Sequence, residues 1–248
     1  MKKEILETFI KRYNLGDIIP KAKWKYSFLN KTLHTRASAD SRSFVVDVIR
    51  SNMPDFNTED VVLCIADTGK VKGMLTPFND EVNITINKRG DRILGMRFSN
   101  ADVECYCTAA DPSAMDPQAK NLDDAINYCV VVPLTDDFLE KFLKGHSALK
   151  DVPNFKVATN SKGAFELVIG YATENSNRIR ITPPTDSVKN KMDCGAIEFP
   201  IKNIIEVLKA NSDISGGTLS ISGAGVIQLY FKNDDYTCTY YQFAYKKV

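Results

Sequence analysis

The sequence has few of the residues on which enzymes and metalloproteins depend. It contains only two histidines, His34 and His146, and neither has a nucleophile or a ligand-like neighbour in the sequence. The six cysteines include no C-x-x-C pair, so the ligand spacing of a zinc site is missing. We therefore expect no catalytic residues, no metal site and no cofactor, and cysteines that pack as small apolar side chains.

Signals for phosphate binding, hydrolysis and membrane insertion are also missing. No glycine-rich phosphate loop, H-E-x-x-H or G-x-S-x-G sequence occurs. No apolar run approaches the roughly 20 residues needed to cross a bilayer. Glu4 and Glu7 interrupt the apolar stretch that a secretion signal requires. These absences predict a cytoplasmic protein with no membrane partner.

Charge of one sign is not in excess, because 32 Lys and Arg residues are balanced by 31 Asp and Glu residues. A nucleic-acid partner would therefore require positive side chains gathered on one surface, with acidic side chains elsewhere. The placement of the lysines decides whether the chain can have such a partner.

Most of the chain alternates apolar and polar residues, which is typical of β-strands. Residues 82–87 alternate in this way, and Phe165, Leu167 and Ile169 share one face of another predicted strand. Turn sequences such as Ser222–Gly225 separate the strands. The pattern predicts a protein built mainly from β-strands and hairpin turns.

Three segments instead have the spacing of apolar residues that is typical of amphipathic helices. They are residues 3–13, residues 135–150 and a segment that begins at Pro200. Thr135 is a suitable N-cap, and proline is favoured at the start of a helix. We expect Gly145 to loosen the end of the second segment.

A fourth, weaker helical segment covers residues 67–76, where two glycines oppose helix formation. With it, the helix centres recur about every 65 residues, which indicates four repeats of a helix followed by several strands. The two halves meet near residues 109–121, a stretch with two prolines that is typical of a linker. We predict domains at 1–110 and 126–248, joined by a connector at 111–125.

Lysines lie on the sides of these helices that face away from the apolar residues, with acidic residues only sparsely among them. If the helices line one concave surface, their cations would bind phosphates without reading bases and would allow sliding. The alternative is that the lysines are only solvated. The candidate DNA-binding residues are Lys3, Lys11, Arg12, Lys70, Lys72, Lys141, Lys144, Lys202 and Lys209.

Parts of the sequence resemble a known family. In the first half, residues 67–75, 78–84 and 109–113 resemble, in this order and separation, the sliding clamps of T-even-type bacteriophages. In the second half, residues 128–131, 134–138 and 240–245 are similar to the wider clamp family, which includes proliferating-cell nuclear antigen. The resemblance spans most of the chain.

The resemblance implies an α+β sliding-clamp fold with two similar domains, inner helices and outer antiparallel sheets. Subunits of this family join head to tail into a ring, for which this chain length favours a homotrimer. The implied partners are double-stranded DNA, bound non-specifically through its backbone, a DNA polymerase and a clamp loader. A phage protein of this kind would act in the cytoplasm of its host.

The resemblance also implies a hydrophobic pocket under the connector that binds partner peptides. Alternation places Tyr241 and Phe243 on one face of the last strand, where aromatic residues suit a sheet core equally well. The candidate pocket residues are Tyr106, Pro112, Met115, Tyr128, Phe243 and Tyr245.

Two other interpretations stay open. A structural or virion β protein without a DNA-encircling role would use its lysines for solubility alone. A single-stranded DNA-binding protein needs aromatic residues among its basic ones, whereas the basic faces here are helical and nearly free of aromatic residues.

Overall fold

The computed structural model describes most of the chain in two compact units. The first unit comprises residues 1–119 and 233–238, and the second comprises residues 120–232 and 239–248. The connector is thus divided between the units, and a short segment near the C-terminus belongs to the first. The described residues are 1–248 except 55, 116–118, 121, 123–124, 160–163, 171–176, 185–186, 190–194 and 246–248.

Four α-helices mark the predicted repeat. They begin at residues 3, 68, 136 and 201, so successive starts are separated by 65 to 68 residues. The predicted period is confirmed, including its weakest member. The helices are α1 (Lys3–Asn14), α2 (Thr68–Leu75), α3 (Asp136–Ala148) and α4 (Ile201–Ala210).

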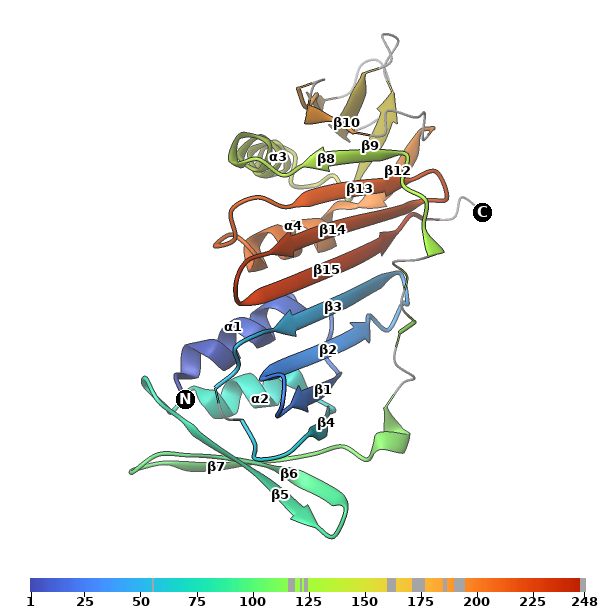
Figure 1. The fold of residues 1–248 in the computed structure, drawn as a ribbon. Coiled ribbons are helices and arrows are strands. Elements are labelled where there is room, and N and C mark those ends of the chain that lie inside the picture. The colour runs from blue at the N-terminus through green and yellow to red at the C-terminus, as the bar shows by residue number, and fades with distance from the viewer. Residues whose placement is uncertain are drawn as a thin grey trace. The chain divides into compact units, whose positions relative to one another are not determined.

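The strands of the first unit form two antiparallel sheets (Figure 1). One has the order β4-β1-β2-β3, followed by the first residues of β15, and the other has the order β5-β6-β7. The strands are β1 (Ala22–Ser27), β2 (Thr32–Ser38), β3 (Phe44–Arg50), β4 (Val61–Ile65), β5 (Asn83–Arg89), β6 (Arg92–Ser99) and β7 (Glu104–Thr108).

The second unit also contains two antiparallel sheets, with the orders β15-β14-β13-β8 and β11-β10-β9-β12. The β13–β14 hairpin turns at Ser222–Gly225, as predicted. The strands are β8 (Val130–Pro133), β9 (Asn154–Thr159), β10 (Phe165–Gly170), β11 (Arg178–Ile181), β12 (Ile197–Pro200), β13 (Thr218–Ser222), β14 (Val226–Lys232) and β15 (Tyr236–Phe243).

Each helix is preceded by an extended segment and followed by three strands, and the preceding segment pairs with another repeat. β4, which leads into α2, pairs with β1 of the first repeat. β12, which leads into α4, pairs with β9 of the third repeat, and β8 pairs with β13 of the fourth. Lys2, ahead of α1, makes a bridge with Glu81, next to β5. The repeats within a unit therefore exchange strands.

The core of the first unit lies where α1 packs against its sheet. Phe9 and Tyr13 are fully buried, and their ring centroids lie 5.7 and 6.2 Å from that of Trp24 on β1. The Tyr13 hydroxyl lies 3.1 Å from Thr68 Oγ1, which ties α1 to the start of α2. Edge-to-face pairs of this kind add about 1 kcal/mol each to the stability that burial provides.

The core of the second unit is also aromatic. The Phe142 ring of α3 lies 5.4 Å from that of Phe155 on β9, which lies 5.9 Å from Phe199 on β12. The apolar residues of α4, including Ile204 and Leu208, are buried as predicted. Both cores bury the apolar faces of the helices and leave the opposite faces to solvent.

Local hydrogen bonds explain where two of the helices begin. The Thr135 hydroxyl accepts a hydrogen bond from the backbone N–H of Phe138 at 3.2 Å, which confirms the predicted N-cap of α3. Asp67 accepts one from the N–H of Lys70 at 3.0 Å and caps α2. This cap offsets the two glycines that make α2 the weakest helix in the sequence.

Gly145 does not loosen the end of α3, so that expectation is wrong. The helix continues to Ala148, and Gly145 is buried. A Cβ atom at this position would lie 3.2 Å from Ile169 Cδ1 and 3.3 Å from Ile179 Cγ2. The glycine therefore allows α3 to approach β10 and β11 closely.

Candidate functional site

The helices of the first unit carry exposed lysines, together with the exposed Glu4 and Glu7 of α1. Lys11 on α1 is exposed, and so are Lys70 and Lys72 on α2, a helix that contacts α1. Lys70 Nζ lies 4.0 Å from Asp67 Oδ2, at the limit of an ion pair. Among the described residues, Lys11 and Lys72 form no ion pair. Their ammonium groups are available to an anion from solvent.

Lys3 is held by the protein itself. Its side chain is only 17% exposed and lies 3.3 Å from Glu7 Oε1. Its ammonium group donates a hydrogen bond to the backbone oxygen of Phe78 at 2.8 Å. Lys3 therefore ties α1 to the segment after α2, and its charge is largely satisfied inside the unit.

Arg12 is fully buried, so its prediction as a DNA-facing residue is wrong. Its guanidinium carbon lies 4.0 Å from the centroid of the Tyr236 ring, and that of Arg50 lies 4.8 Å from the same centroid. Arg50 Nη1 also lies 2.6 Å from Asp235 Oδ1. Burial raises the pKa of Tyr236 to about 12, so the ring stays neutral between the two cations. Arg12 has a structural role.

The lysines of the second unit are exposed but mostly paired with acids on their own helix. Lys141 Nζ lies 2.7 Å from Asp137 Oδ2, and the corresponding distance from Lys144 to Glu140 Oε1 is 2.5 Å. On α4, Lys209 pairs with Glu206 at 2.8 Å. Lys202 is exposed and makes no ion pair within the described part of the chain.

The helices therefore differ in charge, which corrects the expectation of sparse acids. α3 contains three carboxylates, Asp136, Asp137 and Glu140, but only two lysines. α2 contains two lysines and no acid. Exposed ion pairs along a helix are weak and screened by salt, so a phosphate can still compete for a paired lysine. The lysines without a carboxylate partner are the stronger candidates for binding an anion.

His146 marks a basic cluster that the sequence did not reveal. Partial burial and the charges of Lys209 and Lys150 lower the pKa of His146 below its ordinary value. One of these charges, Lys209, comes from α4, a different helix. Lys150 lies four residues after His146 and was visible in the sequence, whereas the contribution of Lys209 from another helix was not.

The aromatic and apolar candidates of the first unit are only partly available. Tyr106 on β7 is 43% exposed. Its ring lies against Gly95, where an added Cβ would be 3.0 Å from the Tyr106 Cζ atom. Pro112 is exposed at the start of a 3₁₀ turn, Pro112–Ala114, which Asp111 caps through the N–H of Ser113 at 3.0 Å. Met115, which follows the turn, is buried.

The candidates of the second unit gather around the β13–β14 turn. Next to Tyr128, the N–H of Gly223 donates to Cys129 Sγ at 2.9 Å. Next to Phe243, the N–H of Ala244 donates to Gly225 O at 2.8 Å. Tyr128 and Phe243 are half-buried, and Tyr245, beyond the end of β15, is 65% exposed. One turn therefore anchors both segments that carry these aromatic residues.

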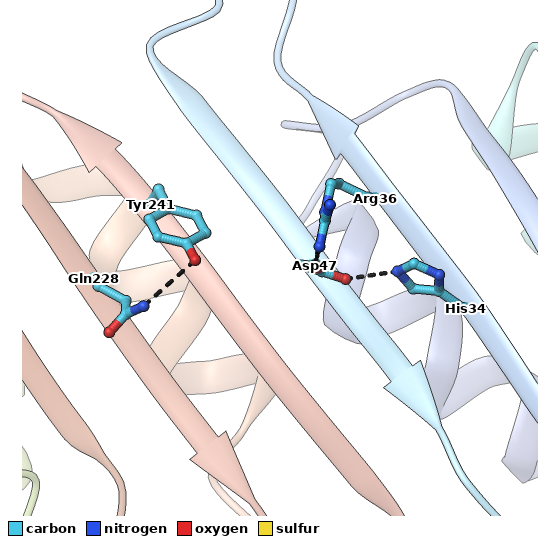
Figure 2. A network of polar contacts seen from close by, with 5 residues as sticks. All are labelled: His34, Arg36, Asp47, Gln228 and Tyr241. Carbon is cyan, nitrogen blue, oxygen red and sulfur yellow. Dashed lines mark hydrogen bonds and ion pairs between the residues drawn. The ribbon is translucent and has the colours of Figure 1, made fainter. Parts of the chain in front are cut away.

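The sheet face turned away from the helices carries polar contacts (Figure 2). In the first unit, Asp47 on β3 lies 2.7 Å from His34 Nε2 and accepts a hydrogen bond from Arg36 Nε at 2.7 Å. Burial acts to raise the pKa of Asp47, but these two partners outweigh it and hold the pKa below its ordinary value. In the second unit, Gln228 Nε2 donates to the Tyr241 hydroxyl at 3.4 Å. Both sheets thus present polar outer faces.

Two edge strands carry opposite charges. β7 pairs only with β6, and β11 pairs only with β10, so one edge of each strand has no partner among the described strands. The exposed residues of β7 include Glu104, which lies 3.3 Å from Arg97 Nη1, and those of β11 are Arg178 and Arg180, the second of which pairs with Glu166. Unpaired strand edges of opposite charge suit pairing with another chain.

The described residues contain neither a metal cluster nor a membrane helix. No group of three or more His, Cys, Asp or Glu side chains among them is arranged to hold a metal ion. None of the described helices is long and apolar enough to span a bilayer.

Comparison with solved structures identifies the fold as that of a sliding clamp. The chain is similar to proliferating cellular nuclear antigen (PCNA) from Entamoeba histolytica, with a TM-score of 0.70 and 14% identity, over 99% of this chain and 96% of that one. It is also similar to A. fulgidus PCNA bound to the C-terminal region of FEN-1, with a TM-score of 0.74 and 13% identity, over 100% of this chain and 98% of that one.

A third similar structure is the PCNA2–PCNA3 complex from Sulfolobus tokodaii, with a TM-score of 0.67 and 10% identity, over 98% and 97% of the chains. No protein-family model and no curated protein matches the sequence. At these identities the similarity establishes the two-domain α+β clamp fold, with its antiparallel sheets, and does not by itself establish function.

Proposed function

We propose that this chain is one subunit of a DNA sliding clamp, a ring that encircles duplex DNA and tethers the replicative polymerase to it. The observation that carries the proposal is the clamp fold over nearly the full length of the chain, with lysines on the exposed faces of its repeated helices. A ring holds DNA by topology, so weak attraction to phosphates suffices, and strong attraction would oppose sliding.

The DNA-binding residues that we propose are the exposed lysines of the four helices. Lys11, Lys72 and Lys202 make no ion pair among the described residues and are the strongest candidates. Lys70, Lys141, Lys144 and Lys209 would exchange a carboxylate for a phosphate. Lys3 would contribute less because its ammonium group is already hydrogen-bonded.

We propose further that three copies close the ring by pairing β7 of one subunit with β11 of the next. A head-to-tail interface of this kind closes when its rotation divides a full turn, and it hides both strand edges. The charge difference between Glu104 and Arg178 supports this pairing.

The polymerase and the clamp loader would bind through short peptides near the connector. The exposed or half-buried aromatic residues Tyr106, Tyr128, Phe243 and Tyr245 support such a site, and Pro112 and Met115 belong to the connector region itself. In one similar structure, A. fulgidus PCNA is bound to the C-terminal region of FEN-1. The sequence resemblance to T-even-type phage clamps supports a viral protein that acts in the cytoplasm of its host.

The solution mass tests the proposal most directly. Light scattering should give about three times the chain mass of 27.7 kDa. After loading by the cognate loader, the protein should stay on circular DNA and dissociate when one cut makes that DNA linear, because a ring slides off an end. A monomer with no effect on any polymerase would favour the alternative, a structural or virion β protein.

A further inference from the structure

A small pocket lies on the second unit, on the sheet formed by β9, β10 and β12. Its volume is about 140 Å³, close to the roughly 150 Å³ of a protein cavity that holds benzene. Val152, Pro153 and Val168 are among its lining residues. Gly170, which also lines it, adds no side chain. The pocket thus has room for an aliphatic group of a few carbon atoms.

Two opposite charges line the same pocket without pairing with each other. Lys156 on β9 and Glu198 on β12 are directly opposite in the antiparallel register. Such neighbours have Cβ atoms about 5 Å apart. Neither residue forms an ion pair or a side-chain hydrogen bond with any described residue. One cation and one anion are therefore available side by side.

A third polar group is the carboxamide of Asn154, two residues before Lys156 on the same strand. Asn154 lines the pocket, and its Oδ1 atom is buried and accepts no hydrogen bond from the described residues. A buried acceptor without a donor is destabilising, so a ligand that supplies an N–H group would remove that cost. Convergent polar groups around an apolar hollow are the usual features of a ligand site.

We propose that this pocket binds a free α-amino acid with a small aliphatic side chain, such as valine. The ligand's carboxylate would bind Lys156, and its ammonium group would donate to Glu198 and to Asn154 Oδ1. Its side chain would enter the hollow beside Val152 and Val168. All three polar groups of the pocket would then be satisfied by one molecule.

Other ligands match this set less well. The C-terminal residue of a peptide supplies a carboxylate and one N–H, and leaves either Glu198 or Asn154 without a donor. The N-terminal residue of a peptide supplies an ammonium group but leaves Lys156 without an anion. Only a molecule that carries an ammonium group and a carboxylate on the same carbon atom satisfies the three groups together.

Equilibrium dialysis of the full chain against radiolabelled L-valine tests the proposal. We expect saturable binding at one site per chain, weakened at least about tenfold by Lys156→Gln and by Glu198→Gln, since each removes a charged hydrogen bond. The control Lys232→Gln removes an exposed lysine from the end of β14 and should leave binding unchanged. Both pocket charges lie on the surface side of the sheet, so the variants should remain folded.

Competition experiments distinguish the possible ligands. Unlabelled L-valine should displace the label, whereas N-acetylvaline, valinamide and the dipeptide alanylvaline should compete at least about tenfold more weakly. Equal competition by the dipeptide would overturn the assignment to a free amino acid. No saturable binding up to about 10 mM, or binding unaffected by both pocket substitutions, would overturn the site itself. None of these outcomes depends on whether the protein encircles DNA.

Discussion

The guanidinium group of Arg12 lies on the face of the Tyr236 ring, 4.0 Å from its centroid, and thereby joins the first helix to the last strand of the chain. Replacing Arg12 with Met keeps much of the buried stem but removes the cation. We expect the free energy of unfolding in urea to fall by about 2 kcal/mol, because the variant has no cation–π interaction in this buried position.

The neighbouring substitution Lys11→Met is the matched control for this prediction. Lys11 is exposed, so its replacement should change the free energy of unfolding by less than about 0.5 kcal/mol. Equal destabilisation of the two variants would contradict the structural role that we assign to Arg12.

The lysines without carboxylate partners should account for most of the attraction to DNA. The triple variant Lys11→Gln, Lys72→Gln, Lys202→Gln should bind duplex DNA more weakly, and the slope of log affinity against log salt should decrease by about 0.9 for each phosphate that is no longer neutralised. Fluorescence anisotropy over a salt series measures this slope. Lys232→Gln is the control, and an unchanged slope in the triple variant would mean that these lysines are merely solvated.

DNA binding should strengthen as the pH falls below the ordinary histidine pKa. Because the pKa of His146 is lowered, the ring is neutral at pH 7 and gains its charge only below about pH 6.5. That charge would add to Lys150 and Lys209. The variant His146→Gln should lack this part of the pH dependence, whereas His34→Gln should keep it. Parallel affinity profiles for wild type and His146→Gln would refute the prediction.

The proposed ring interface predicts a charge-swap experiment. Arg178→Glu should place like charges on the two strand edges and shift the mass measured by light scattering from about three times 27.7 kDa toward one. Adding Glu104→Arg to the same chain should restore the assembly. If the single variant keeps the mass of wild type, another pair of edges forms the ring.

Phe243 should matter for partner binding more than for folding, since it is only half-buried at the end of β15. Phe243→Ala should weaken the binding of a C-terminal peptide of the cognate polymerase at least about tenfold, the size typical of an aromatic anchor. Phe28→Ala removes another partly exposed aromatic residue, 40% accessible in the β1–β2 turn, and serves as the control. Undiminished peptide affinity would remove Phe243 from the site.

Local sequence patterns predicted the helices because their causes are local. The apolar spacing of α1, α3 and α4 and the cap at Thr135 depend on residues within one or two turns. The ion pairs of Lys141 and Lys144 with acids four residues earlier were equally visible in the sequence, and this spacing predicts that α3 is not a basic helix.

The features that the sequence did not predict all depend on distant partners. The sequence predicts that Arg12, which follows Lys11, is exposed. In the structure it is buried against Tyr236, which is distant in the sequence. In the sequence Lys150 lies near His146, whereas in the structure the charge of Lys209 on α4 also lowers the pKa of His146. The exchange of strands between repeats has the same origin, because alternation identifies a strand but not its neighbour.

The placement of residues 233–238 in the first unit has a consequence for biosynthesis. The N-terminal half of this protein emerges from the ribosome long before Asp235 and Tyr236 are made. These two residues are the partners of Arg50 and Arg12. Until Asp235 and Tyr236 are made, Arg50 and Arg12 lack these native partners, and the edge of β3 lacks its neighbour. The first half of the nascent chain should therefore be a client for chaperones, and its completion should be among the slowest steps of folding.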